Sequence, residues 1–181
     1  MRGTQVDQTK PWQELSRTRA YDNFRRIDRV VYELPDGTQK AYDIEAHVGS
    51  VTIIAVTPDE QVIMVRQYRP GPDKVLLEFP GGVIEPGEQA QAAAARELLE
   101  ETGYAGDLTC LGARYLDAYS TGVHYGFVAT NCRRVADPRP DETEFMAIEL
   151  ISAARFKDVV RSDYAPGAGM GWLALEELGW R

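Results

Sequence analysis

The stretch Gly81–Tyr104 reads GGVIEPGEQAQAAAARELLEETGY, and it decides how the rest of the chain is interpreted. Its first part combines glycines with a Pro-Gly pair, which is typical of a loop. From residue 89 to about residue 102 strong helix formers dominate, and Gly103 is a natural helix end. The stretch therefore predicts a glycine-rich loop that leads directly into an α-helix.

Three glutamates crowd the last turns of this predicted helix. Glu97 lies three residues before Glu100 and four before Glu101, so the three carboxylates share one side of the helix. Without a cation they raise one another's pKa, and the negative end of the helix dipole adds to the repulsion. Oxygen ligands without histidine or cysteine suit hard ions such as Mg²⁺ or Mn²⁺. The cluster therefore predicts a divalent metal site.

The overall composition excludes several classes of partner. The chain has 181 residues, enough for one ordinary domain with a proper core, and a formal net charge of −8. This charge argues against nucleic acid or an anionic membrane as the main partner. The start of the chain has no apolar core of signal-peptide type, and no apolar run is long enough to span a bilayer. With only two cysteines and no C-x-x-C spacing, we expect a soluble cytoplasmic protein with reduced thiols.

Most of the remaining chain has the pattern of β-strands. The β-type runs cover residues 29–34, 39–48, 50–57, 61–69, 75–79, 107–118, 123–135 and 144–151. The first two flank a Pro-Asp-Gly turn and predict a hairpin, whereas residues 1 to about 24 are polar and are expected to be irregular. Two further helices are predicted, one at 152–164 with Ser152 as its cap and one at 171–179. This order predicts an α/β fold, with helices on both faces of a mixed sheet.

The loop and helix together resemble the Nudix box, G-x5-E-x7-R-E-U-x-E-E-x-G-U. The matching residues are Gly82, Glu88, Arg96, Glu97, Leu98, Glu100, Glu101, Gly103 and Tyr104. An isolated E-x-x-E-E run is usually a solvated helix face. The seven fixed positions of the full pattern would coincide by chance on the order of once in a million such chains, so the chain is identified as a member of the Nudix hydrolases.

The resemblance extends beyond the box to one branch of the family. The segments VRQYR at 65–69 and LLEFPGG at 76–82 are similar to the ADP-ribose and nucleoside diphosphate sugar pyrophosphatases. This similarity implies an α/β/α sandwich that cleaves a nucleotide sugar into a nucleoside monophosphate and a phosphorylated second moiety. It also implies a homodimer, with residues 1–48 as the N-terminal, dimer-forming segment and hairpin and residues 49–181 as the catalytic domain.

The same resemblance assigns roles to individual residues. The implied metal ligands are the Gly81 carbonyl, Glu97, Glu100, Glu101 and Glu144. Glu142 is the implied catalytic base, with Glu100 in reserve, and Arg96 is expected to brace Glu88 or Glu100. The expected substrate-binding residues are Arg69, Gly82 and Glu88. Arg66 is three residues from Arg69 and so on the opposite face of its strand, where a surface or interface role is expected.

Two other functions stay open at this point. Tyr119 stands near the place where ADP-ribose enzymes usually carry a proline, and a tyrosine there resembles Nudix enzymes that act on dinucleoside polyphosphates. Hydrolysis of a dinucleoside polyphosphate or a modified nucleoside triphosphate is therefore the first alternative. The second is a non-catalytic module that senses a nucleotide, although every charged position of the box is present here. His47 and His124 have strand-like surroundings and are expected to be structural.

Overall fold

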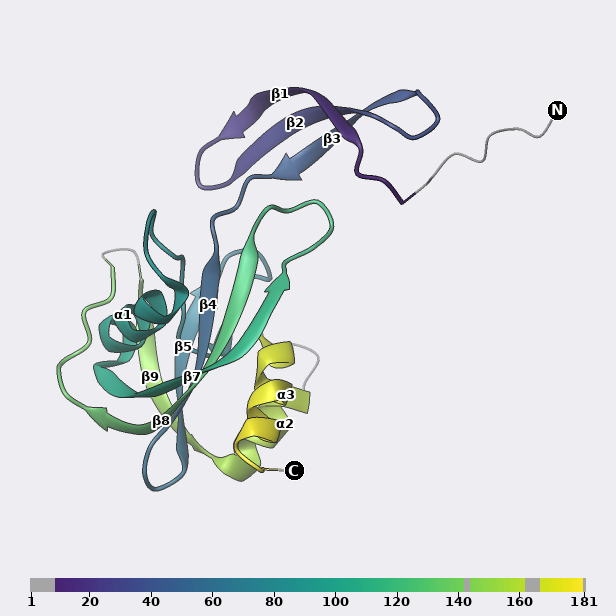
Figure 1. Ribbon diagram of the computed structural model, residues 1–181. Helices are drawn as coiled ribbons and strands as arrows, with labels where there is room; N and C mark the ends of the chain where they lie inside the picture. Colours follow the sequence, from purple (N-terminus) through teal and green to yellow (C-terminus); the bar gives the residue numbers. More distant parts are fainter. Residues whose placement is uncertain (1–8, 142–143, 162–166, 181) are drawn as a thin grey trace. The chain divides into compact units, whose positions relative to one another are not determined.

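The computed structural model describes residues 9–141, 144–161 and 167–180 (Figure 1). Its internal contacts group into two units. The first comprises Met1–Val48 together with Tyr115–Val123, and the second comprises Gly49–Arg114 together with His124–Arg181. Within the described residues, no helix is long and apolar enough to cross a membrane.

The first unit contains a three-stranded antiparallel sheet in the order β1-β2-β3. Its strands are β1 (Gln13–Asp22), β2 (Arg26–Glu33) and β3 (Gln39–Glu45). The turn between β2 and β3 places Gly37 at a φ of 82°, and the Asp36 side chain accepts hydrogen bonds from the amide and hydroxyl of Thr38. The predicted hairpin is confirmed.

The strand β1 corrects the expectation of an irregular start. Every residue of β1 is exposed, so no hydrophobic alternation marks it in the sequence. Ion pairs fasten it to β2 instead. The carboxylate of Asp28, which is 6% exposed, accepts from Arg17 Nη1 at 3.1 Å and from Arg19 Nε at 2.5 Å. The pKa of Asp28 is held below its usual range by hydrogen bonds from Arg19 and Arg17.

Aromatic side chains gather within this first unit. Tyr42 lies between Trp12, at a ring-centroid distance of 5.4 Å, and Tyr119, at 6.1 Å. Tyr32 contacts both Trp12 and Tyr42 edge-on. Tyr119, which had suggested a different substrate, is therefore stacked on Tyr42.

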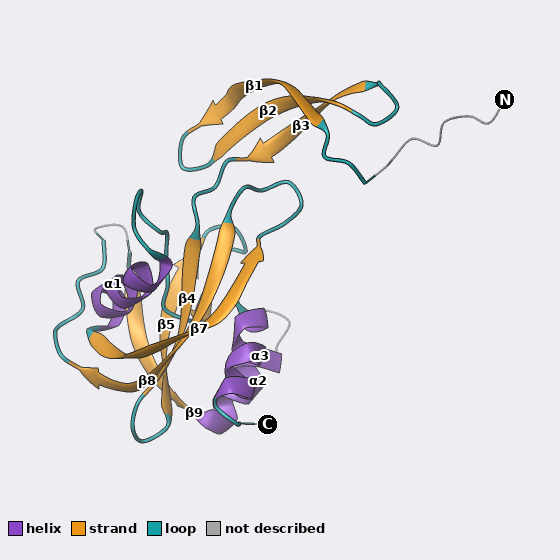
Figure 2. Ribbon diagram, viewed as in Figure 1, coloured by secondary structure: helices purple, strands orange, loops and turns teal. Residues whose placement is uncertain are grey.

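The second unit is built on a six-stranded mixed sheet (Figure 2). Its strands are β4 (Ser50–Val56), β5 (Gln61–Arg69), β6 (Lys74–Glu78), β7 (Tyr104–Tyr115), β8 (Val123–Arg134) and β9 (Met146–Ser152). The order is β6-β5-β4-β8-β7, and β9 pairs with β5. Strands β4 and β8 run parallel, whereas β5 is antiparallel to β4, β6 and β9. The predicted mixed sheet is confirmed.

Helices cover both faces of this sheet (Figures 1 and 2). Helix α1 (Ala90–Thr102) packs on one face, and helices α2 (Ala153–Arg161) and α3 (Ala168–Glu177) pack on the other. The α/β/α sandwich expected from the sequence is therefore confirmed. The predicted cap of α2 is present as well, because the Ser152 hydroxyl accepts from the amide of Arg155 at 3.2 Å.

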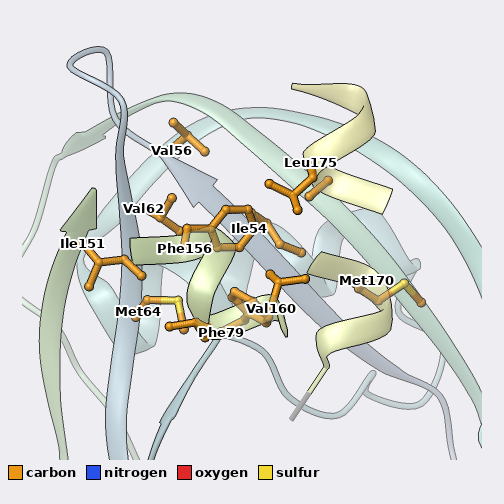
Figure 3. Close-up of a cluster of buried hydrophobic side chains, with 12 residues drawn as sticks. Ile54, Val56, Val62, Met64, Phe79, Ile151, Phe156, Val160, Met170 and Leu175 are labelled. Carbon is orange, nitrogen blue, oxygen red and sulfur yellow. The ribbon is translucent and has the colours of Figure 1, made fainter. Parts of the chain in front are cut away.

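The core under α2 and α3 is centred on one aromatic ring (Figure 3). Phe156 of α2 is fully buried and contacts Phe79 and Trp180 edge-on, with ring centroids 5.8 and 6.0 Å away. Ile54, Met64 and Val160 belong to the same cluster. This packing ties both C-terminal helices to the central strands.

The core under α1 sets the position of the glutamate helix. Ala93 and Ala94 are fully buried against the sheet, and their small side chains let the helix axis approach closely. Leu98 follows on the same face and is 1% exposed, whereas its neighbour Leu99 is 38% exposed. The helix therefore turns one stripe to the sheet, and its orientation about its own axis is fixed.

These two leucines provide a matched pair for a stability test. Leu98→Ala should lower the free energy of unfolding by roughly 2–5 kcal/mol, because it removes buried methyl groups and leaves a cavity. Leu99→Ala, on the exposed side of the same turn, should change it by less than about 1 kcal/mol. Urea unfolding followed by circular dichroism measures both values. Equal losses for the two variants would contradict this orientation of α1.

Candidate active site

The C-terminal end of α1 is held by backbone hydrogen bonds. Gly103 adopts a left-handed conformation with φ 74°, and its amide donates to the carbonyl of Leu99. The loop that follows β8 then docks on this end, because the amide of Val135 donates to Gly103 O at 2.9 Å and that of Arg139 to Glu100 O at 2.6 Å. The chain leading towards Glu144 is thereby anchored beside the glutamates of α1.

Glu101 is the most deeply buried carboxylate of this region. It is 4% exposed, and its Oε2 accepts from the amide of Gly81 at 2.9 Å. Burial raises the pKa of Glu101 to about 8, although the hydrogen bond from the amide of Gly81 acts to lower it. The negative charges of Glu97 and Glu144 raise it further. The positive charge of Arg69 acts in the opposite direction. A buried carboxyl among other carboxyls is a site that a cation would stabilise.

The two glycines before α1 allow its glutamates to approach the loop. Gly81 has φ 155°, and a Cβ there would overlap the backbone of Val51. A Cβ on Gly82 would overlap the carboxylate of Glu97. Burial is also the main reason that the pKa of Glu97 is raised, although Arg96 opposes the rise. The loop can therefore lie against β4 because Gly81 lacks a side chain, and against the Glu97 carboxylate because Gly82 lacks one.

Arg96 joins the loop to the helix. Its Nε and Nη2 donate to the two oxygens of Glu88, each at 3.0 Å, and Nη2 also donates to Val83 O at 3.0 Å. Its Nη1 donates to Glu97 Oε1 at 2.9 Å and to Glu100 Oε2 at 3.1 Å. The hydrogen bonds between the Arg96 and Glu88 side chains are the largest cause of both pKa shifts: they lower the pKa of Glu88 and raise that of Arg96. The expected contacts of Arg96 with Glu88 and Glu100 are both present.

Arg69 lies on the face of β5 that α1 covers. The pairing of β5 with β6 places Arg69 and Gln67 on the same face as Val65, whose partner is Glu78. Arg69 Nε donates a hydrogen bond to Oε2 of Glu78 at 2.8 Å, and Nη2 forms an ion pair with the same oxygen at 2.7 Å. Glu78 was not among the residues expected at the site, because in the sequence it looks like an ordinary residue of a buried strand.

Arg66 lies on the other face of β5, as its separation from Arg69 predicts. It is paired in the sheet with Leu77 and Ala147, and its side chain binds Oε2 of Glu149 at 2.9 and 2.6 Å. Arg66 thus has a surface ion pair and no contact with the glutamates of α1.

Two expected residues come from the loop before β9. Glu142 lies outside the described residues. Glu144 accepts from the amide of Asp141 through Oε2 at 3.0 Å, and its own amide donates to Asp141 O at 2.9 Å. Its charge raises the pKa of both Glu97 and Glu101, which places it near them.

The carboxylates fit a hard divalent ion in chemistry rather than in their present orientation. In the described parts of the chain, no three acidic, histidine or cysteine side chains converge as ligands of one ion. Glu97 and Glu100 turn their oxygens to Arg96, and Glu101 turns to the amide of Gly81. The donor set, oxygen alone and partly buried, is nevertheless the one that Mg²⁺ and Mn²⁺ prefer.

Of the two histidines, His124 lies in the second unit. His124 Nδ1 is 2.8 Å from the hydroxyl of Ser50, its neighbour across the parallel pair β4–β8. His47 belongs to the first unit.

Comparison with known proteins gives a consistent result. Residues 46–168 match the NUDIX domain. The chain is 36% identical to an ADP-ribose pyrophosphatase of Bacillus subtilis (strain 168), over 80% of this chain and 82% of that protein. It is 40% identical to an ADP-sugar pyrophosphatase of Mus musculus, over 76% of this chain and 71% of the relative. The crystal structure of an ADP compounds hydrolase shares the fold, with a TM-score of 0.82, 24% identity and coverage of 94% of this chain and 96% of that chain.

Substitution of Gly82 tests the contact between loop and helix. Gly82→Ala should displace the Glu97 carboxylate, because the new Cβ overlaps it, and should weaken Mn²⁺ binding at least about tenfold. Gly71→Ala is the matched control, since a Cβ there meets nothing within 4 Å. Calorimetric titration with Mn²⁺ measures the affinity of each variant. Unchanged affinity in Gly82→Ala would show that Glu97 holds no ion from its present place beside Gly82.

The raised pKa of Glu101 predicts a pH-dependent stability of the metal-free protein. A carboxyl whose folded pKa is raised stabilises the fold below its unfolded pKa, and this contribution is lost as the pH rises through the folded value. The melting temperature should therefore fall between about pH 5 and pH 8. Glu101→Gln should flatten this fall and raise the melting temperature at pH 8. Added Mg²⁺ should raise the melting temperature of the wild type but not that of this variant. Scanning calorimetry, first with a chelator and then with Mg²⁺, measures these melting temperatures. If the variant keeps the pH dependence of the wild type, the pH effect does not come from Glu101.

Proposed function

The chain belongs to the Nudix family, and from this membership and the geometry of its acidic helix we propose that it hydrolyses the diphosphate bridge of a nucleotide sugar. ADP-ribose is the first candidate substrate. The products are a nucleoside monophosphate and a sugar phosphate. Two of its relatives, an ADP-ribose pyrophosphatase and an ADP-sugar pyrophosphatase, support this choice of substrate class.

The observation that carries the proposal is the buried carboxyl of Glu101 beside Glu97. A buried acid with a pKa of about 8, next to the partly buried carboxyl of Glu97, whose pKa is also raised, lowers the stability of the folded protein when both are ionised. The cost is understandable if cations are held there, and a diphosphate is the substrate that such cations attract. Every charged residue of the box is present, which favours an enzyme over a module that only senses a nucleotide.

Under this proposal each residue has a defined task. Glu97, Glu101 and the Gly81 carbonyl hold the ions, with Glu100 and Glu144 as additional ligands, and Mg²⁺ or Mn²⁺ is the expected metal. Bound ions withdraw charge from the diphosphate and lower the pKa of water. Arg69 binds the diphosphate, since a permanently charged guanidinium suits phosphate oxygens.

The remaining box residues keep this arrangement in place. Arg96 keeps the loop against the helix, with Glu88 as its main partner. Gly82 lets the backbone approach the substrate, because it has no side chain in the way.

The reaction is a substitution at phosphorus by water. The oxygen of water forms a bond to one phosphorus, and the bond from that phosphorus to the bridging oxygen breaks, with its electron pair remaining on the departing phosphate. A carboxylate accepts the proton of the water. We assign this role to Glu142, with Glu100 in reserve. Positioning and charge neutralisation supply most of the rate acceleration, as is usual in phosphoryl chemistry.

The arrangement of the whole protein is part of the proposal. We assign residues 49–181 to catalysis and residues 1–48 to a segment that joins two copies into a homodimer. The exposed aromatic and apolar side chains of the first unit, Trp12, Leu15, Tyr21 and Phe24 among them, support a surface that a second copy covers. Both cysteines are free thiols, which supports a cytoplasmic location.

A substrate panel tests the proposed reaction. With Mg²⁺ in excess, ADP-ribose and other nucleotide sugars should be cleaved faster than dinucleoside polyphosphates or modified nucleoside triphosphates, with products identified by chromatography. Water labelled with ¹⁸O shows which phosphorus is attacked. Glu101→Gln serves as the impaired control and should reduce kcat at least about a hundredfold, the scale of losing one positioned electrostatic group.

Each other outcome of the panel favours a named alternative. Preferential cleavage of dinucleoside polyphosphates or modified triphosphates would overturn the substrate class and keep the hydrolase. Nucleotide binding without any turnover would favour the sensing module.

A further inference from the structure

We propose that Glu78 is a positioning residue, which holds the guanidinium of Arg69 in the orientation that receives the diphosphate. The inference rests on the proposed function and adds to it a residue outside the Nudix box.

The geometry of the pair orients Arg69 in one direction. Nε and Nη2 of Arg69 both engage a single oxygen of Glu78, at 2.8 and 2.7 Å. Within the described residues, Nη1 makes no hydrogen bond to the protein. The side chain of Arg69 is 45% exposed, whereas Glu78 is 6% exposed. One edge of the guanidinium is thus fixed by a buried acid, and the other is available to a ligand from solvent.

The burial of Glu78 indicates that the pair is more than a surface contact. An exposed ion pair contributes little to stability, and a carboxylate buried to this degree loses much of its hydration. For stability alone, an apolar side chain would suit this buried position of β6 better than a carboxylate. The carboxylate is better explained by what it does to Arg69.

The neighbouring charges explain why Arg69 needs a partner of its own. Arg69 is close enough to Glu101 for its charge to lower the pKa of that carboxyl. A guanidinium without Glu78 would be drawn towards Glu101 and Glu97, where it would compete with bound cations for the same oxygens. Glu78 therefore keeps the arginine beside the acidic cluster without letting it neutralise the cluster.

A second ion pair on β5 shows the same contact without the same surroundings. Arg66 also uses Nε and Nη2 on one carboxylate oxygen, Oε2 of Glu149, and its side chain is also 45% exposed. It lies on the opposite face of the sheet, and Glu149 is far less buried than Glu78. The two pairs differ in burial and in the acids nearby, so Glu149 is a matched control for Glu78.

The test is a double-mutant cycle on the full-length protein with Mg²⁺. Glu78→Gln should reduce kcat/KM for ADP-ribose at least about tenfold, mainly through KM, because a displaced binding group weakens the hold on the diphosphate. In an Arg69→Ala background the same substitution should cost less than about twofold, since Glu78 then has nothing to position. Glu149→Gln should stay within about twofold of the wild type. Thermal melting checks that every variant is folded.

The affinity for ADP, measured by calorimetry on the same variants, separates this inference from the proposed function. If the wild type cleaves ADP-ribose but Glu78→Gln costs the same factor with and without Arg69, the positioning role is overturned and the function stands. If the wild type cleaves no nucleotide sugar, the proposed function is wrong, and the ADP affinities of the variants then test the role of Glu78. The positioning role is supported if Glu78→Gln weakens ADP binding only when Arg69 is present. It is overturned if the wild type binds no ADP, or if Glu78→Gln weakens ADP binding equally with and without Arg69.

Discussion

The structure depends on how one helix end tolerates its negative charges. Glu97, Glu100 and Glu101 lie where the helix dipole is also negative, and two of them are largely withdrawn from water. Arg96 offsets part of this charge and in doing so binds the loop to the helix through Glu88 and Val83. Among the residues that the structure describes, Glu101 accepts a hydrogen bond from the amide of Gly81 alone. The balance is incomplete, and this excess of negative charge is the reason that we propose a cation site here.

The rest of the second unit serves to hold this helix end still. The alanines of α1 bring it close to the sheet, and Leu98 fixes its rotation. Gly103 ends the helix, and the carbonyls at this end accept hydrogen bonds from amides of the loop that follows β8. The far face, packed around Phe156, anchors strands β4 and β5 from behind. The acidic cluster is therefore placed by backbone and apolar contacts, which are indifferent to whether an ion is bound.

The sequence predicted what depends on local chemistry. Helix formers and Gly103 define α1, a Pro-Asp-Gly turn defines the β2–β3 hairpin, and the odd spacing of Arg66 and Arg69 separates them between two faces. It failed where the deciding contacts come from elsewhere in the chain. Strand β1 is a strand because Asp28 of another strand holds its arginines, and Glu78 is notable only because Arg69 bends back to it. Neither fact has a signature in the residues immediately around it.

The alternation along β5 limits how this region can change in length. Arg66 and Arg69 are separated by an odd number of positions, so one faces α1 and the other faces α2 and α3. A single residue gained or lost between them would bring both arginines to the same face of the sheet. Either Arg66 would then turn towards α1, or Arg69 would turn away from the acids of α1. Insertions and deletions are therefore tolerable in the turn at residues 70–73, between β5 and β6, but not within the strand itself.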